Sequence, residues 1–239
     1  MVGKEIRLLS NLASSLNMTV PAPQVLGTPC QEFSAPYWGH TYLPGATADT
    51  LDLNPAQRGG LAGDLGEFLR QLHAIRPANA ASIGFEIDIG RGGLPHNQQR
   101  ARECLPIIHQ ALGEGWSRRL RAFINSPPEG EAETFCPIHG DLYSRHLILS
   151  RRERLTAVID WGGACIADPA LDLSVAYTFL QAEHRVRFWA AYGNVDAFAR
   201  LRARYLGVCR YGVRALAYAI VKKDSSLARE ALFVIKNNC

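Results

Sequence analysis

The stretch His139–Leu149 reads HGDLYSRHLIL, and residues 158–161 read VIDW. These stretches place Asp141 before a predicted β-hairpin and Asp160 directly after it. Two carboxylates in these positions suit phosphoryl transfer, in which one accepts the proton of the attacking hydroxyl and the other holds the magnesium ion that neutralises phosphate charge. The sequence therefore predicts a site for phosphoryl transfer around the hairpin.

The spacing within the first stretch is that of a protein-kinase catalytic loop, where a metal-binding side chain follows the catalytic aspartate by five residues. His146 stands at this distance after Asp141, and His139 precedes the same aspartate by two residues. Asp160 lies where the metal-binding aspartate of a kinase follows the hairpin. We expect Asp141 to be the catalytic base and Asp160 to bind magnesium.

Composition excludes several other classes of protein. The 239 residues carry a net charge of +4, with 47% hydrophobic and 20% charged residues, as in an ordinary globular enzyme. No run of like charges predicts a nucleic-acid-binding arm, and no apolar stretch is long enough to predict a membrane span or a signal peptide. The six cysteines form no C-x-x-C pair, so we expect reduced thiols in a cytoplasmic protein.

Periodicity predicts an α+β protein with a small first part and a larger helical part. Helices are expected over residues 6–16, 61–73 and 99–124, and from Asp172 to the end. We expect short strands within residues 24–43, hairpin strands at 147–149 and 155–159, and a loop-rich insertion at 77–98. The predicted division is an incomplete nucleotide-binding lobe with its hinge (1–45) and a helical lobe carrying the catalytic loop (46–239).

Three motifs occur in order: His139-Gly140-Asp141-Leu142, Ile159-Asp160-Trp161-Gly162 and Asp168-Pro169-x-x-Asp172-Leu173. Together they resemble the signature of the aminoglycoside phosphotransferase family of kinase-like enzymes. The resemblance covers essentially the whole chain. It implies a kinase-like fold, ATP or GTP as phosphate donor, Mg²⁺ as cofactor and a small hydroxyl-bearing acceptor, either an antibiotic or a metabolite.

Further site residues follow from this resemblance. Glu5 is similar to the glutamate that pairs with the nucleotide-binding lysine, and Tyr42 and Leu43 resemble the hinge beside the adenine site. Asp172 is expected to hydrogen-bond the catalytic loop, and His139 to orient it. Simpler interpretations remain open for neighbouring residues, namely a turn cap for Asp168, a packing residue for His73 and an apolar anchor for Trp161.

His146 departs from the family pattern, because kinases have asparagine at this position. A similar histidine occurs in the macrolide phosphotransferase branch. Magnesium prefers oxygen donors, so three roles remain open for His146: weak metal binding, a phosphate contact, or a hydrogen bond that holds the loop.

A second departure lies before Glu5. The family has a glycine-rich loop and a β-strand lysine there, whereas only four residues precede Glu5 in this sequence. We therefore expect a truncated chain with impaired activity. The alternative is a catalytically inactive, kinase-like binding module or gene fragment.

The charge balance of the C-terminal region bears on the acceptor. Residues 173–239 contain four acidic and eleven basic side chains. Because a polycation needs a carboxylate-rich pocket, we expect a neutral, weakly charged or anionic acceptor rather than an aminoglycoside. Glu129, Glu131 and Glu133 lie outside this region and could still supply acid.

Overall fold

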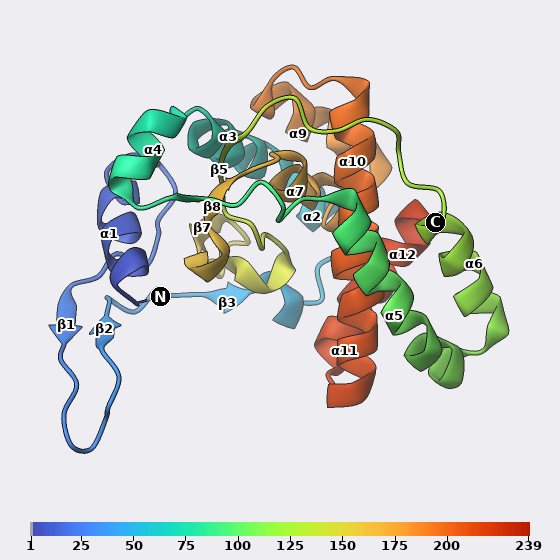
Figure 1. Ribbon diagram of the computed structural model, residues 1–239, viewed down its shortest axis with the longest axis horizontal. Helices are drawn as coiled ribbons and strands as arrows, with labels where there is room; N and C mark the ends of the chain where they lie inside the picture. The colour runs from blue at the N-terminus through green and yellow to red at the C-terminus, as the bar shows by residue number, and fades with distance from the viewer. Residues whose placement is uncertain (1) are drawn as a thin grey trace.

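Helices make up most of the fold in the computed structural model, which describes residues 2–239 (Figure 1). The α-helices are α1 (Val2–Leu12), α2 (Pro55–Gly60), α3 (Ala62–His73), α4 (Pro77–Ile83), α5 (Leu94–Leu112), α6 (Glu114–Ile124), α7 (Ala170–Leu173), α8 (Val175–Thr178), α9 (Arg185–Tyr192), α10 (Ala197–Gly207), α11 (Ala215–Lys222) and α12 (Ser225–Asn238). A π-helix, Val208–Arg214, joins α10 to α11.

The strands form three small sheets. They are β1 (Val25–Gly27), β2 (Tyr37–Gly39), β3 (Ala46–Thr47), β4 (Glu86–Ile87), β5 (Cys136–Ile138), β6 (Leu147–Leu149), β7 (Leu155–Val158) and β8 (Cys165–Ala167). Strands β1 and β2 pair as an antiparallel hairpin, which projects away from the body of the molecule (Figure 1). The second sheet has the antiparallel order β3-β6-β7, and the third has the order β4-β8-β5.

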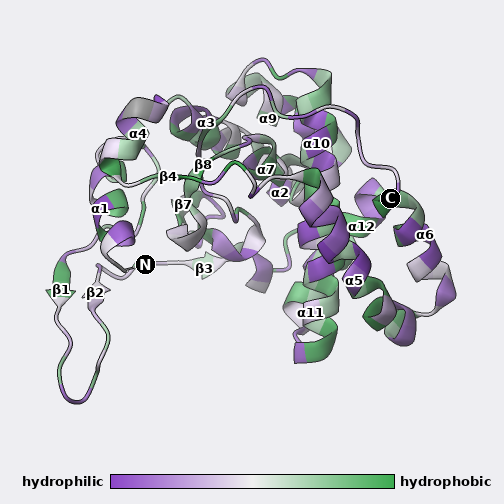
Figure 2. Ribbon diagram, viewed as in Figure 1, coloured by the Kyte–Doolittle hydropathy of each residue, from purple (hydrophilic) through white to green (hydrophobic). Residues whose placement is uncertain are grey.

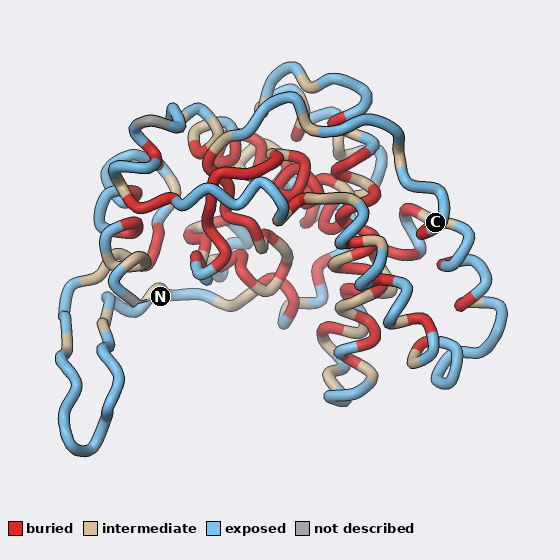
Figure 3. Tube along the Cα trace, in the orientation of Figure 1, coloured by how far each residue is buried: buried red, intermediate tan, exposed pale blue. Residues whose placement is uncertain are grey.

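The core consists of two apolar clusters (Figures 2 and 3). The larger joins α1 and α3 to the strands on either side of the catalytic loop, and Leu9, Leu69 and Trp161 are buried within it. The smaller lies between α5, α6 and the C-terminal helices. The first helix thus buries its apolar stripe against the same core as the later helices. The functional division at residue 45 stays a prediction.

Two sequence predictions about the middle of the chain are wrong. Residues 77–98 are not mainly loop, because α4, β4 and the start of α5 lie there; Pro77 starts α4 at a position where a missing N–H costs nothing. The single helix predicted over 99–124 is two helices. Gly113, with φ of +86°, ends α5, and α6 begins at the next residue.

The other predicted elements are present. The helix at 61–73 is α3, and the hairpin strands are β6 and β7. The helix predicted over 6–16 is α1, which begins and ends four residues earlier. The region after Asp172 is mainly helical, with short connections such as residues 193–196. The predicted α+β class is thereby confirmed. Among the helices of residues 2–239, none combines the length and the apolar character needed to cross a membrane.

Candidate active site

The catalytic loop begins where β5 ends, and its tight turn requires glycine. Gly140 has φ of +79°, a conformation that side chains disfavour. A Cβ on Gly140 would also lie 2.3 Å from the backbone oxygen of Gly163. The loop thus packs directly on the segment that follows Asp160. This contact fixes the two halves of the site relative to each other.

Asp172 holds this loop from α7. Its fully buried carboxylate accepts hydrogen bonds from the backbone N–H of His139 (2.6 Å) and of Gly140 (2.9 Å). The Nε2 atom of His73 lies 3.3 Å from the same carboxylate. Burial acts to raise the pKa of Asp172, but the hydrogen bonds from His73 and Gly140 bring it below its ordinary value. Asp172 thus contacts the catalytic loop in the way expected from the sequence.

Asp172→Asn is expected to lower the free energy of unfolding by about 2–4 kcal/mol, since an amide leaves a buried N–H without an acceptor and removes a paired charge. The lowered pKa sets the sign of the pH dependence. The unfolded state takes up the proton first as the pH falls, so stability from Asp172 is present above about pH 4 and is lost as the pH drops through the folded pKa. Urea denaturation at pH 7 and pH 3.5 measures both effects.

Asp52, which is exposed, provides the control for this substitution. Asp52→Asn should leave stability unchanged at both pH values. An Asp172→Asn variant with the stability and acid sensitivity of the wild type would contradict the role of this carboxylate in holding the loop.

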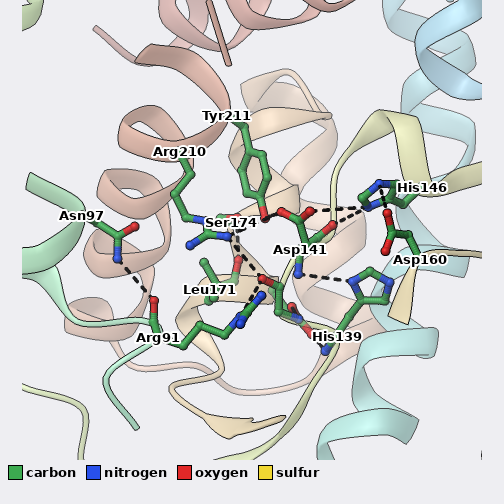
Figure 4. A network of polar contacts seen from close by, with 12 residues as sticks. Arg91, Asn97, His139, Asp141, His146, Asp160, Leu171, Ser174, Arg210 and Tyr211 are labelled. Carbon is green, nitrogen blue, oxygen red and sulfur yellow. Dashed lines mark hydrogen bonds and ion pairs between the residues drawn. The ribbon is translucent and has the colours of Figure 1, made fainter. Parts of the chain in front are cut away.

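Side chains lie near both carboxylate oxygens of Asp141, with the shorter contacts at Oδ1 (Figure 4). The hydroxyl of Tyr211 donates to Oδ1 at 3.1 Å, and Nη2 of Arg210 lies 3.5 Å from the same atom. Burial and the charge of Asp141 raise the pKa of Tyr211 well above its ordinary value, which keeps its hydroxyl a donor. The side chain of Asp141 is 36% exposed. At Oδ2 the recorded contact is the longer one with Nδ1 of His146, at 4.0 Å, so this oxygen can still accept a proton.

Arg210 and Tyr211 come from the π-helix, and sequence reasoning missed both. The sequence predicts a regular helix here, because apolar and small residues such as Cys209 and Gly212 recur at helical spacing. In the structure the wider π-helical turn brings Arg210 and Tyr211 to Asp141. Such turns are rare and often mark functional sites. An arginine and a tyrosine within an apolar stripe were the available signal.

Asp160 stands at the far end of the hairpin in a strained conformation. Its φ of 63° and ψ of 68° lie in the left-handed region, where residues other than glycine are uncommon and often functional. Its carboxylate is 60% exposed and lies 3.2 Å from Nε2 of His146. The hydrogen bond from His146 lowers the pKa of Asp160, against the opposing effect of burial.

His146 links the two aspartates (Figure 4). Its Nδ1 lies 2.7 Å from the backbone oxygen of Asp141, which can only accept, while Nε2 faces Asp160. Burial acts to lower the pKa of His146, but its hydrogen bonds to Asp160 and to the Asp141 carbonyl raise it. Of the three roles left open for His146, the structure forms the loop-holding hydrogen bond. A neutral ring that donates from Nδ1 keeps a lone pair on Nε2, so the metal-binding and phosphate-contact roles of His146 stay predictions.

His139 is buried, and its hydrogen bonds position the catalytic loop. Its Nε2 lies 2.9 Å from the backbone oxygen of Ile159, and its Nδ1 accepts from the N–H of Asp141 at 3.3 Å. Burial lowers the pKa of His139, so the ring is neutral. It therefore connects the catalytic loop to the residue before Asp160. Its ring packs against Trp161, which is buried as an apolar anchor.

A magnesium ion would find an incomplete set of protein ligands. Among residues 2–239, no group of three or more His, Cys, Asp or Glu side chains is arranged to hold a metal. Magnesium in phosphoryl-transfer sites is typically held by one or two carboxylates and by the phosphates of the substrate, and it keeps several waters. The exposed carboxylate of Asp160 fits this mode, in which the ion arrives with the nucleotide.

The residues predicted to bind nucleotide lie in two places. Tyr42 and Leu43 line a cavity of about 790 Å³ together with Ala157 of β7, the strand that leads to Asp160. Glu5 lies instead beside the loop after Asp160, where a Cβ on Gly162 would be 3.9 Å from its carboxylate. The structure therefore places Glu5 near Asp160, and Tyr42 and Leu43 in the cavity beside the middle of β7.

Several polar residues around the loop have structural contacts. Asp168 accepts a hydrogen bond at 2.9 Å from the N–H of Ala170, the first residue of α7, and also pairs with buried Arg202. The packing role expected for His73 was too simple, because its ring hydrogen-bonds both Asp172 and Tyr192.

Arg145, which sequence reasoning missed, anchors the catalytic loop. It pairs with Asp49 (3.1 Å), just after the hinge, and with Asp224 (2.8 Å), the N-cap of α12. These contacts join residues 79 and 96 positions away in the chain, so no local pattern could have indicated them.

Comparison with known proteins gives the family of this chain. The family model described as "Phosphotransferase enzyme family" (APH) matches residues 2–206. The chain belongs to this phosphotransferase family. A 55-residue segment is also 34% identical to an uncharacterized protein of Bacillus subtilis strain 168, YcbJ; it spans 23% of this chain and 18% of that protein. The family predicted from the three motifs is thereby confirmed.

Solved structures of other phosphotransferases share the fold. The GDP and kanamycin complex of APH(2")-IIia is similar with a TM-score of 0.68 at 20% identity, covering 98% of this chain and 80% of that one. Macrolide 2'-phosphotransferase MphH from Brachybacterium faecium has a TM-score of 0.57 at 22% identity, covering 97% of this chain and 78% of that one. Spectinomycin phosphotransferase APH(9)-Ia, in complex with ADP and spectinomycin, has a TM-score of 0.63 at 13% identity, covering 97% of this chain and 78% of that one. At these identities the likeness confirms the predicted kinase-like fold.

Proposed function

We propose that this protein transfers the γ-phosphoryl group of ATP or GTP to a hydroxyl group of a small molecule, either an antibiotic or a metabolite. The observation that carries the proposal is the geometry of the two aspartates. Asp141 lies in a pocket with one oxygen held, and Asp160 is exposed at the other end of the hairpin, with His146 between them. Family membership supports the same class of reaction.

Asp141 is the proposed catalytic base. Tyr211 and Arg210 engage Oδ1, so Oδ2 is the atom that takes the proton of the attacking hydroxyl. Proton transfer to a positioned carboxylate is worth about 10²- to 10⁴-fold in rate. Asp172 and His139 act on this step indirectly, because they fix the backbone that carries Asp141.

Asp160 is the proposed protein ligand for Mg²⁺, and His146 orients its carboxylate. When bound, the metal ion supplies neutralisation of the charge on the transferring phosphate. The carboxylate is 60% exposed, so a metal ion can reach it from solvent.

Tyr42 and Leu43 are proposed to contact the base of the nucleotide, because they line the cavity beside β7. Glu5 is proposed to lie near the phosphates, because it is next to the loop that follows Asp160. No lysine or arginine pairs with Glu5 within residues 2–239. We therefore expect slow transfer from the 239-residue polypeptide.

The experiment measures nucleotide binding and phosphate transfer separately. Calorimetry should detect binding of ATP or GTP that strengthens with Mg²⁺, and γ-labelled nucleotide should yield a labelled product with a member of a panel of macrolides, aminoglycosides and small hydroxy metabolites. Comparison of ATP with GTP identifies the donor. Failure to bind either nucleotide in the presence of Mg²⁺ would contradict the proposal.

A kinase-like binding module without catalysis is the second candidate. The unpaired carboxylate of Glu5 among the described residues favours it, because the corresponding ion pair is required in protein kinases. This candidate predicts nucleotide binding without a labelled product for any acceptor in the panel. The two candidates therefore give opposite results in the transfer assay.

A further inference from the structure

Asp141 opens into a pocket of about 360 Å³. Its walls come from the catalytic loop, the π-helix and the last two helices. The lining residues are Asp141, Tyr143, Arg145, Arg210, Tyr211, Arg214, Ala215, Tyr218 and Leu227. If Asp141 is the catalytic base, the acceptor must occupy this pocket, so its walls carry information about the chemistry of the acceptor.

Two of the three arginines in the pocket are already compensated by carboxylates. Arg145 pairs with Asp49 and Asp224, and Arg210 lies 3.5 Å from Asp141. Arg210 also lies within 3.4 Å of the backbone oxygen of Gly140. Arg145 and Nη2 of Arg210 therefore have partners in the absence of any ligand, whereas Nε of Arg210 is buried without a hydrogen-bond partner.

Arg214 has no such partner. Arg214 is half-buried. Within residues 2–239, its guanidinium forms no hydrogen bond or ion pair with another residue. Burial and the nearby cations Arg210 and Arg100 lower the pKa of Arg214. Arg100, which does not line the pocket, is itself paired with Glu103 at 3.1 Å. A partly desolvated cation beside other cations is unfavourable unless an anion joins it.

We propose that Arg214 binds an anionic group, a carboxylate or a phosphate, on the hydroxyl-bearing acceptor. This inference rests on the proposed function. Arg210, Tyr211 and Arg214 stand on one turn of the π-helix, and all three line the pocket. The acceptor then lies with its hydroxyl toward Asp141 and its anionic group toward Arg214. Planar guanidinium suits both anions, because it can donate two parallel hydrogen bonds.

The remaining walls add little negative charge for an amine-rich acceptor. Tyr143 and Tyr211 stack with ring centroids 5.0 Å apart, and Tyr218 and Leu227 complete the aromatic and apolar surface. Among the described residues that line the pocket, Asp141 is the one that carries a carboxylate. Glu131, which sequence analysis considered as a source of acid, lines a separate cavity with Asp168. A polycationic acceptor would place its ammonium groups beside Arg214 without compensation, which discriminates against it.

The test uses four sugars that share one ring and differ in charge: glucose, glucosamine, glucuronate and glucose 6-phosphate. Calorimetry measures their dissociation constants with nucleotide and Mg²⁺ present. We expect both anions to bind about tenfold or more tightly than glucose, and glucosamine to bind most weakly. Comparison of the dissociation constants of glucuronate and glucose 6-phosphate shows whether the site prefers a carboxylate or a phosphate. Equal binding of all four, preference for glucosamine, or no binding of either anion would overturn the inference.

Substitutions of Arg214 test whether this residue causes the preference for anionic sugars. Arg214→Ala should abolish the advantage of the anions over glucose, and Arg214→Lys should keep part of it, because the charge remains but the planar fork is lost. Arg118→Ala, an exposed arginine on α6, serves as the matched control and should bind like the wild type. An Arg214→Ala variant that keeps the preference would also overturn the inference.

The same titrations separate this inference from the proposed function. Arg214→Ala should leave the dissociation constant of the nucleotide unchanged. If nucleotide affinity falls with the substitution, the anion held by Arg214 is the phosphate of the donor, and the inference is wrong. If the wild type does not bind nucleotide at all, the proposed function itself fails.

Discussion

Asp141→Asn is expected to reduce kcat for phosphate transfer by about 10²- to 10⁴-fold, because the variant lacks the carboxylate oxygen that accepts the proton of the acceptor. Asparagine has the same shape, so the contact with Tyr211 is retained. Nucleotide affinity should not change. Steady-state rates with labelled nucleotide, together with calorimetry for the nucleotide, measure the two effects separately.

Asp52→Asn is the matched control for this change, since Asp52 is an exposed aspartate outside the site. It should have wild-type kcat. Tyr211→Phe removes one hydrogen bond to Oδ1 but leaves the base, so it should cost less than Asp141→Asn. Wild-type activity in Asp141→Asn would show that the base is elsewhere.

Asp160→Asn is expected to remove the strengthening of nucleotide binding by Mg²⁺ and to lower kcat/KM by about 100-fold or more, since a neutral amide is a poor magnesium ligand. Asparagine tolerates the left-handed backbone found at this position, so the hairpin should fold normally. Titration of ATP or GTP with and without Mg²⁺ gives the first effect, and initial rates give the second.

Asp52→Asn again serves as control and should keep the magnesium dependence. Circular dichroism and the urea midpoint of Asp160→Asn check that the variant is folded. A folded Asp160→Asn protein in which Mg²⁺ still strengthens nucleotide binding would place the metal on another group.

Local patterns in the sequence were enough to predict the hairpin and its two aspartates. Strands β6 and β7 were predicted because aliphatic runs flank a polar turn, and α3 because its apolar residues recur at helical spacing. The contact of Asp172 with the catalytic loop came from the resemblance to a family, and the structure forms it.

Features that depend on tertiary contacts or on subtle backbone geometry could not be predicted. The break between α5 and α6 occurs at a single glycine, Gly113, and a glycine can also lie inside a helix. The partners of Arg145 are distant in sequence. The π-helix is only seven residues long, too short to change the apolar pattern of the helices on either side, so the placement of Arg210 and Arg214 at the pocket could not be predicted.

Side-by-side assay of the wild type and Asp141→Asn for transfer of labelled γ-phosphate to an acceptor, with Mg²⁺ and with EDTA, tests the central claim most directly. The account predicts a phosphorylated acceptor with the wild type in Mg²⁺ alone. It predicts loss of that product in EDTA and a decrease of about 10²-fold or more in Asp141→Asn. Equal product from both proteins, or wild-type transfer that persists in EDTA, would contradict it.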